Sequence, residues 1–451
     1  MYTDIAMPNK INLIIFASSL HDNTSVIGSR STLFEGIRQF AELDITYPSM
    51  LASGRRDLAG MLDGGQFGGC ALPDGRHNKT ICFIATGGTE EIFKDFVAAI
   101  PHPVLLLSDG LHNSFAASLE IKTWLSQQGI DSTLFNAPLD YNPTFFEQME
   151  RELFGGDGTA DTLALPDSLP KFPKSVVRAF EKTRIGLIGG ASGWLISSAV
   201  DLESVAKTYG AKFDEISLSE LEEEFAAVAA DDPEIGKVCG KMEAFLTDGR
   251  TTADLQEAAR MYVALRRLCT RHALNALTLK CFGILGSCRT TACLALALLN
   301  DEGIIAGCEG DIPALWTMLY VKYAYGQPAF MANPASSNRR ECTIDFAHCT
   351  IPLTMVHGYR LPSHFESQTG IGIAGSVPSG PYRIVKISGK NLDQFYETEG
   401  DLMMNTNIPQ RCRTQIRVRF RSEADFDRFL RVSKGNHIIL CKAAGPGGPS
   451  R

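Results

Sequence analysis

Acidic, amide and imidazole side chains in the second half of the chain have the types and spacing of a metal site. Glu309 and Asp311 stand two residues apart directly after an apolar run. Buried carboxylates cost free energy unless they meet a cation or a proton donor. Asn333 follows in the segment FMANP, His348 comes after a strand-like run, and His437 comes before another. This donor set predicts a divalent cation, Mn²⁺ first, with Mg²⁺, Co²⁺ or Fe²⁺ as alternatives.

The same residues also have simpler interpretations. Helix N-termini favour acidic residues, so Glu309 and Asp311 can cap a helix expected over residues 313–325. A single histidine in a strand, such as His348 or His437, is more often a hydrogen-bonded core residue than a ligand. The metal interpretation therefore depends on these side chains occurring together.

Strands must position these side chains, and they are indicated by continuous apolar runs, which are typical of parallel sheets buried on both faces. Strands are expected at residues 11–17, 81–85, 104–107, 185–188, 276–281 and 303–308, and helices at 115–128, 217–230 and 252–272. In such sheets, ligands bind at the carboxyl ends of the strands. The loops TGGTE, SDGLHNS and GGASGW follow three of these strands.

From about residue 343 the pattern changes to short alternating runs separated by Gly and Pro, which is typical of antiparallel β-structure. The predicted fold class is α/β, with two doubly wound α/β domains followed by a C-terminal antiparallel β-barrel-like domain. The expected boundaries are 1–175, 176–340 and 341–451. The metal site should lie where the middle and last parts meet, because its ligands come from both.

Composition narrows the class of protein. The 451 residues are 44% hydrophobic and 21% charged, as in globular proteins. With 43 basic and 51 acidic residues, the net charge is −8, and no long basic run suggests nucleic acid as a partner. No apolar run is long enough to cross a membrane, and the N-terminus lacks the pattern of a signal peptide.

The 12 cysteines are mostly embedded in apolar runs, which favours reduced thiols and a cytoplasmic location. Cys281, Cys288 and Cys293 lack CxxC spacing, so a zinc site is not expected there. The loops GGASGW and TGGTE match neither the dinucleotide-binding nor the phosphate-binding pattern. A nucleotide cofactor is therefore not expected.

Nine segments of the chain together resemble a known family. They are ALTLKC from Ala276, TTACLALALLNDEGIIAGCEGDIPALWTM from Thr290, PAFMANP from Pro328, DFAHCT from Asp345, SHFESQTGIGIAG from Ser363, CRTQI from Cys412, GNHIIL from Gly435, GLIGGASGW from Gly186 and ATGGTE from Ala85. These segments resemble the L-fucose and L-arabinose isomerase family, especially its shorter members of uncertain sugar substrate. The resemblance touches all three expected parts and is most specific after residue 276.

The resemblance implies a metal-dependent aldose–ketose isomerase that acts on a monosaccharide through an ene-diol intermediate. Motif order places the metal ligands at Glu309, Asn333, His348 and His437, where Asn333 replaces an acidic residue of the family. Asparagine can supply a carbonyl oxygen but cannot act as a base. Glu309 is therefore the expected ligand and possible base, and Asp311 the expected second acid or base.

Further residues are candidates for binding the sugar. They are Lys280, Trp194, His364, Glu366 and Arg413, together with Thr86, Glu90 and Asn113 in loops of the first part. Lys280 can equally form a surface salt bridge, Trp194 can be a packing residue, and His364 with Glu366, alternating on a strand-like face, can be a structural pair. In the resembling family, loops of the first part reach a neighbouring subunit's site, so a homo-oligomer is implied.

Three alternatives stay open. The same chemistry can serve an anionic hexose, 6-sulfonated or phosphorylated, such as sulfoquinovose, with Arg289, Arg360 and Arg413 as candidate partners of the anion. An epimerase uses the same ene-diol with different reprotonation. A non-catalytic sugar-binding relative would fit the replacement at Asn333.

Overall fold

The computed structural model describes residues 9–46, 78–155, 163–432 and 434–443. Its contacts divide the chain into two compact units, residues 1–164 with 335–338, and residues 165–334 with 339–451. Most of the N-terminal segment, on which the expectation of no signal peptide rests, lies outside the described residues. The division into three domains at 175 and 340 stays a prediction.

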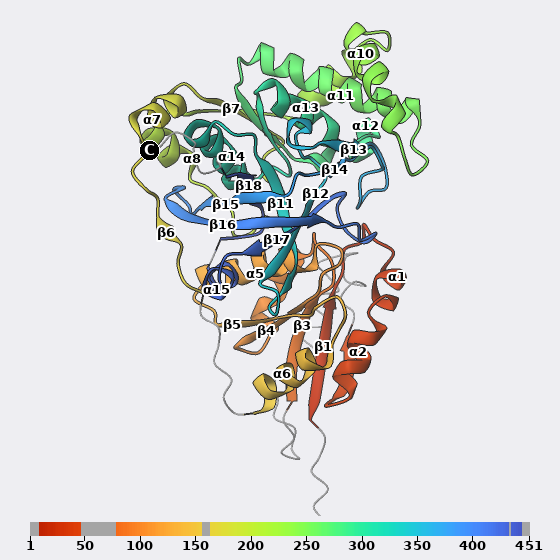
Figure 1. The fold of residues 1–451 in the computed structure, drawn as a ribbon, viewed down its shortest axis with the longest axis vertical. Helices are drawn as coiled ribbons and strands as arrows, with labels where there is room; N and C mark the ends of the chain where they lie inside the picture. Colours follow the sequence, from red (N-terminus) through yellow and green to blue (C-terminus); the bar gives the residue numbers. More distant parts are fainter. Residues whose placement is uncertain (1–8, 47–77, 156–162, 433, 444–451) are drawn as a thin grey trace, which may run out of the picture. The chain divides into compact units, whose positions relative to one another are not determined.

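The first unit contains a five-stranded parallel sheet in the order β2-β1-β3-β4-β5 (Figure 1). The strands are β1 (Lys10–Phe16), β2 (Glu42–Thr46), β3 (Asn78–Ile84), β4 (Val104–Ser108) and β5 (Ser132–Asn136). The helical segments are α1 (Asn23–Gly28), α2 (Ser31–Arg38), α4 (Glu90–Phe96), η2 (Val97–Ala99), α5 (Ser114–Gln127) and α6 (Pro143–Phe154). The apolar runs predicted as strands form the buried centre of this sheet. They are apolar without alternation because both faces of a parallel sheet are covered.

The second unit begins with a four-stranded parallel sheet in the order β10-β9-β7-β8. The strands are β7 (Arg184–Ile188), β8 (Lys212–Ile216), β9 (Ala276–Leu279) and β10 (Ile305–Gly307). The helical segments are α7 (Lys174–Glu181), α8 (Leu202–Tyr209), α9 (Leu218–Ala227), α10 (Pro233–Met242), η3 (Glu243–Phe245), α11 (Thr252–Arg271), η4 (Cys281–Ile284), α12 (Leu285–Cys288), α13 (Cys293–Glu302) and α14 (Ile312–Tyr325). The carboxyl ends of β7, β9 and β10 are neighbours, so the loops that follow them meet at one edge.

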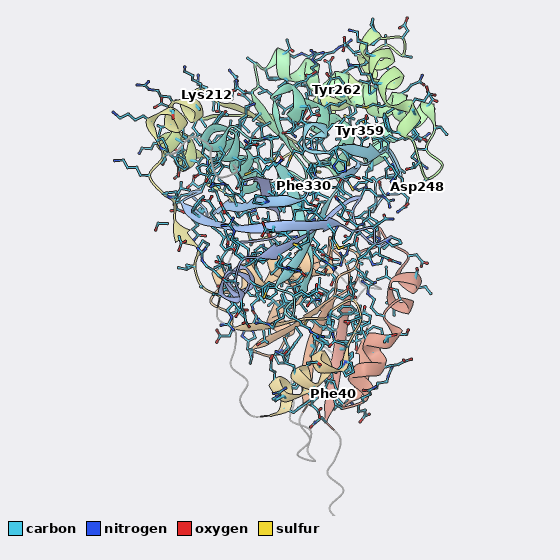
Figure 2. All side chains as sticks on the ribbon, viewed as in Figure 1. Phe40, Lys212, Asp248, Tyr262, Phe330 and Tyr359 are labelled. Atoms are coloured by element: carbon cyan, nitrogen blue, oxygen red, sulfur yellow. The ribbon has the colours of Figure 1, made fainter. Side chains whose placement is uncertain are left out.

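The C-terminal strands close into a six-stranded antiparallel, barrel-like sheet in the order β15-β18-β11-β12-β17-β16, because β15 also pairs with β16. These strands are β11 (Phe330–Asn338), β12 (Thr343–His348), β15 (Gly380–Ser388), β16 (Gln394–Asn405), β17 (Thr414–Phe420) and β18 (Ile438–Lys442). The other elements are β6 (Asp167–Ser168), which pairs with β16, η5 (Leu353–Met355), β13 (Gly358–Arg360), β14 (Ala374–Ser376) and α15 (Glu423–Arg431). Phe330, labelled in Figure 2, begins β11 and is buried.

The architecture is therefore mixed α/β, with parallel sheets and a closed antiparallel barrel-like sheet. Among the described residues, no helix has the length and apolar character needed to cross a membrane.

Candidate metal and active site

The loop between β10 and α14 holds two residues in the left-handed backbone region. Glu309 has φ 62° and Gly310 has φ 72°. A Cβ atom at Gly310 would clash with the carbonyl oxygen of Gly190, so this position requires glycine. The loops after β7 and β10 are thus in contact, and Ser192 N donates to Glu309 O at 3.2 Å. Left-handed backbone at a non-glycine residue costs free energy and is concentrated at functional sites.

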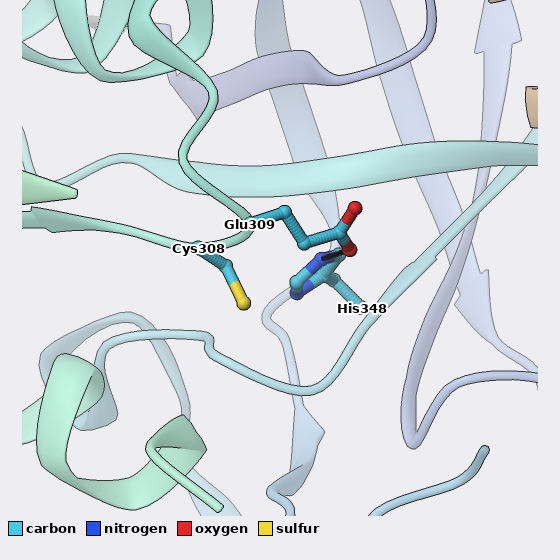
Figure 3. A group of neighbouring side chains, drawn as sticks. All are labelled: Cys308, Glu309 and His348. Atoms are coloured by element: carbon cyan, nitrogen blue, oxygen red, sulfur yellow. Dashed lines mark ion pairs between the residues drawn. The ribbon is translucent and has the colours of Figure 1, made fainter. Parts of the chain in front are cut away.

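The Glu309 carboxylate faces two imidazole rings and an indole. Its Oε1 atom lies 3.6 Å from His348 Nε2 and 3.5 Å from His437 Nε2. Its Oε2 atom accepts a hydrogen bond from Trp194 Nε1 at 2.7 Å. Figure 3 shows the carboxylate directed at the His348 ring from the loop after β10. On its far side, His348 Nδ1 lies within hydrogen-bond distance of Thr350 Oγ1, at 3.0 Å.

Asp311 supports this arrangement from the first turn of α14. Its Oδ1 atom accepts from Ala314 N at 2.7 Å, so Asp311 is the N-cap that the simpler interpretation expected. Its Oδ2 atom lies 2.8 Å from His437 Nδ1 and 3.8 Å from Lys386 Nζ. A carboxylate that accepts from one imidazole nitrogen leaves the other nitrogen as a lone-pair donor. His437 Nε2 therefore faces Glu309, where it carries a proton in the charged ring or offers its lone pair to a metal in the neutral ring.

Two buried donor atoms at this place show how the residues fit a metal ion. His437 Nε2 and Asn333 Oδ1 are buried and have no hydrogen-bond partner among the described residues. β11 and β18 pair with Ala332 opposite Ile438, and one further step of this register places Asn333 opposite His437. Unsatisfied buried polar atoms are rare and costly in folded proteins. Two imidazole nitrogens, a carboxylate oxygen and an amide oxygen are a donor set that divalent transition metals accept.

The charges of the cluster favour a cation. Burial alone raises the pKa of Glu309, but His437 and His348 outweigh it and hold this pKa well below its usual range. For Asp311, Lys386 and His437 likewise outweigh burial, and the pKa is lowered. Burial alone lowers the pKa of His437, but Glu309 and Asp311 raise it to about 9. Two ionised carboxylates therefore favour a positive charge at His437, whether a proton or a metal ion.

An aromatic row leads away from Glu309. The Trp194 ring meets Phe282 edge-on, with centroids 5.1 Å apart, and Phe282 meets the His364 ring at 5.8 Å. Lys280, at the end of β9, is half-buried, and its Cβ atom lies close to Gly189 in the loop that carries Trp194. Trp194, Lys280 and His364 are thus brought to the same edge of the second unit, and their assignment to sugar binding stays a prediction.

The segment around His364 and Glu366 corrects one expectation. It forms a turn, not a strand, so the two side chains do not share a strand face. The turn has a local cause, because His364 Nδ1 pairs with Ser367 Oγ at 2.9 Å and Ser363 Oγ donates to Gln368 Oε1 at 3.2 Å. Such side-chain hydrogen bonds compete with extended backbone.

The three arginines considered for an anionic substrate have different surroundings. Arg413 is half-buried, and its Nε atom donates to Ser363 O at 2.7 Å while its Nη2 atom donates to Ser363 Oγ at 3.0 Å. Arg413 therefore lies beside the turn that carries His364. Arg289 and Arg360 are exposed.

The remaining candidates lie in the first unit, at the carboxyl ends of its parallel strands. Thr86 follows β3 and accepts from Ser18 N at 2.7 Å. Glu90 is the first residue of α4 and is buried. Asn113 precedes α5 with a left-handed φ of 59°. Their assignment to sugar binding stays a prediction.

Two residues next to the site were not predicted from the sequence. Lys386, on β15, is 1% exposed and pairs with Asp311. Cys308, directly before Glu309, has its sulfur within 4.8 Å of ligand atoms of Glu309 and His348. The run PYRIVKIS, with one lysine among apolar residues, contained the signal for Lys386.

Comparison with known proteins gives one relationship. No family model matches the chain. A sulfoquinovose isomerase of Clostridium sp. (strain MSTE9) is 26% identical over 223 residues, 45% of this chain and 49% of that protein. The chain thus matches about half the length of this curated relative. The similarity supports the sugar-isomerase part of the sequence-based expectation at a coarse level, and the assignment to the L-fucose and L-arabinose isomerases stays a prediction.

Proposed function

We propose that this chain is a metal-dependent aldose–ketose isomerase acting on a monosaccharide. One observation carries the proposal. A single carboxylate oxygen, Glu309 Oε1, lies about equally far from the Nε2 atoms of His348 and His437, and the His437 atom has no hydrogen-bond partner among the described residues. The similarity to a sulfoquinovose isomerase supports the same reaction class.

The metal would be held by Glu309, Asn333, His348 and His437, with Mn²⁺ as the first choice and Mg²⁺, Co²⁺ or Fe²⁺ as alternatives. When bound, such an ion acts as a Lewis acid that stabilises developing enolate charge. Asp311 fixes the His437 ring through Nδ1, and Thr350 contacts His348 Nδ1. These outer contacts orient the two imidazoles before any ligand arrives.

Isomerisation moves a proton between C1 and C2 of the sugar. Glu309 is ionised at neutral pH because its pKa is well below the usual range, so its carboxylate can accept that proton. Trp194 holds the other carboxylate oxygen by its indole N–H and keeps the side chain in one orientation. Both oxygens of Asp311 are engaged by the chain itself, which favours a positioning role for Asp311 over the acid or base role expected from the sequence.

A second candidate function is the same reaction on an anionic hexose, sulfonated or phosphorylated at C6. The matched relative carries the name of a sulfonated sugar, which favours this substrate class. Arg413 lies half-buried beside the His364 turn, whereas Arg289 and Arg360 are exposed. Its Nε and Nη2 atoms donate to Ser363, so the N–H groups that remain are the ones that would bind a sulfonate or phosphate. A cytoplasmic homo-oligomer, which the resemblance to the L-fucose and L-arabinose isomerases implies, completes this proposal.

Deuterium exchange at C2, followed by NMR in D₂O with Mn²⁺, tests the reaction. The panel includes neutral aldoses and 6-sulfonated and 6-phosphorylated hexoses. We expect exchange with ketose formation, reduced on the order of 10²- to 10⁴-fold in Glu309→Gln and by a chelator. Glu423→Gln removes an exposed carboxylate and serves as the matched control. Sugar binding without exchange by any member of the panel would instead identify a binding protein, and epimer formation would identify an epimerase.

A further inference from the structure

A sulfur atom lies beside the proposed metal ligands. Cys308 ends the run that leads into Glu309, and it is 5% exposed. Its Sγ atom, a Glu309 carboxylate oxygen and a His348 ring nitrogen all lie within 4.8 Å of one another. Figure 3 shows the three side chains converging, two from the loop after β10 and one from the end of β12. Ligand atoms around a tetrahedral zinc ion are roughly 3.5 Å apart, so small shifts would complete such a site.

A second sulfur atom, that of Cys281, is in contact with the Cys308 sulfur. Cys281 Sγ lies 3.0 Å from Cys308 Sγ, and both residues are buried. The parallel strands β9 and β10 pair with Thr278 opposite Gly307, which brings the two segments after them together. Two thiolates on one tetrahedral zinc ion lie about 3.8 Å apart, so the two sulfurs have to separate by less than about 1 Å. Cys281 is not among the ligand atoms that lie within 4.8 Å of one another, so its sulfur also has to move towards Glu309 and His348 to join the ion.

The cluster therefore contains two overlapping sets of three donors. Glu309 and His348 belong to both sets, and the third donor is His437 Nε2 in one and Cys308 Sγ in the other. Thiolate ligands select soft and borderline cations, whereas Mn²⁺ and Mg²⁺ favour oxygen and nitrogen. Which third donor is used depends on the kind of ion.

We propose that Cys308, Glu309 and His348 form a second binding mode for a thiophilic divalent cation such as Zn²⁺ or Cd²⁺, with Cys281 as an additional sulfur ligand. The inference rests on the proposed function only in that Glu309 and His348 also belong to the catalytic metal site. On binding, each coordinating thiol, Cys308 and then Cys281, loses its S–H proton to solvent as its sulfur–metal bond forms, with no change in oxidation state. A thiophilic ion in this mode competes with Mn²⁺ for the two shared ligands and inhibits the enzyme.

Cadmium chloride is the probe, added to full-length protein that a chelator has freed of metal. We expect a thiolate-to-cadmium charge-transfer band in the ultraviolet that saturates at one Cd²⁺ per chain, and a ¹¹³Cd NMR shift typical of sulfur ligation. Cys308→Ser should lose the band and bind Cd²⁺ at least about tenfold more weakly, since even outer ligand-supporting residues contribute that much. Cys342→Ser, which removes a half-exposed thiol between β11 and β12, is the matched control and should keep both signals.

A band that survives in Cys308→Ser, or Cd²⁺ binding without any sulfur signature, would overturn the proposal. If Cys308→Ser fails to fold, anomalous scattering from cadmium-soaked wild-type crystals decides, because a peak bonded only to Glu309, His348 and His437 also overturns it. Mn²⁺ binding by electron paramagnetic resonance and deuterium exchange of the Mn²⁺-loaded wild type are measured separately. Their failure would count against the isomerase while leaving the sulfur signal intact, so the two failures are distinguishable.

Discussion

Strand β12 carries a buried titratable side chain on each of its faces, and the two clusters around them differ. Asp345 and His348 are three residues apart, so their side chains point to opposite faces of the strand. On one face, Asp345 Oδ2 accepts from Arg411 Nη1 and Oδ1 accepts from Arg417 Nε, both at 2.7 Å. On the other face, His348 meets Glu309 at 3.6 Å.

The two clusters differ in how many buried polar atoms have no hydrogen bond. Both oxygens of Asp345 are taken by guanidinium groups, so this cluster resembles a closed structural ion pair. Arg411 bonds Asp345 through Nη1, although its Nη2 atom makes no hydrogen bond among the described residues. Around Glu309 three buried atoms are in that position, namely His437 Nε2, Asn333 Oδ1 and Lys386 Nζ. A buried polar atom without a hydrogen bond lowers the stability of the folded state. We infer that the first cluster stabilises the barrel, and that the second is built for a ligand.

The largest expected effect comes from breaking the closed cluster. Asp345→Asn removes the charge that pairs with Arg411, whose side chain is 1% exposed. Removing one partner of a buried ion pair costs about 3–5 kcal/mol, so the free energy of unfolding in urea should fall by that amount. Asp401→Asn, at an exposed position on β16, should change it by less than about 0.5 kcal/mol. A loss below about 1 kcal/mol in Asp345→Asn would remove the distinction between the clusters.

In metal-free protein, both clusters contain carboxylates with lowered pKa values and should lose stability on acidification, and the Glu309 cluster should add an alkaline loss through His437. His437 has its pKa raised to about 9 from an ordinary value near 6.5, so its contribution is fully present below about pH 6.5 and is lost as pH rises through 9. The raised pKa of His437 corresponds to a contribution of roughly 3 kcal/mol to the free energy of unfolding. Asp345 has a lowered pKa because the two arginines outweigh its burial, so its contribution is present above about pH 3.9 and is lost on acidification.

Calorimetric melting with a chelator, from acid to pH 9.5, measures both slopes. The alkaline loss should disappear in His437→Gln, and the acid loss should shrink in Asp345→Asn. Because the metal replaces the His437 proton, Mn²⁺ affinity should rise over the same alkaline range. An unchanged alkaline slope in His437→Gln would show that the raised pKa does not contribute to stability.

Much of the fold could be predicted because strands buried on both faces have continuous apolar sequences. INLIIFA, ICFIA and VLLL are β1, β3 and β4. β16 was missed because its sequence, QFYETEGDLMMN, mixes charged and apolar residues on a half-exposed strand. α13 was missed because it is buried on nearly all sides and lacks an amphipathic period.

The site was only partly predictable, for reasons of geometry. Glu309 and Asp311 could be found because they follow a strand end in sequence. Lys386 was missed despite the apolar run around it, since a lysine in an alternating strand is ordinarily assigned to the solvent face, whereas here it is buried against Asp311. The Cys281–Cys308 pair was invisible to spacing rules, because two parallel strands bring the two sulfurs together across 27 residues.

A smaller effect is expected from removing the carboxylate charge of Asp311, which contacts His437. Asp311→Asn keeps the N-cap of α14 but removes the charge that faces His437 and Lys386. Losing such an outer partner typically weakens metal binding 10- to 100-fold, which Mn²⁺ titration measures. The variant should also lose stability, because Lys386 becomes an unpaired buried charge.

The double variant Asp311→Asn with Lys386→Met separates these two losses. It removes both charges, so stability should return toward that of the wild type while Mn²⁺ affinity stays low. Recovery of both properties together would mean that Asp311 serves only to neutralise Lys386, and the open cluster would then be no different in kind from the closed one.

The smallest effect should come from the hydrogen bond between the indole and Glu309. Trp194→Phe keeps an aromatic ring against Phe282 but removes the N–H that donates to Glu309 Oε2. A hydrogen bond to a charged group contributes about 1.5 kcal/mol or more, so kcat/KM should fall about tenfold. Because that donor favours the ionised carboxylate, the acid limb of the kcat/KM profile should also move to higher pH. Trp124→Phe, on α5, should leave the limb in place; a shift in both variants, or in neither, would show that Trp194 acts only by packing.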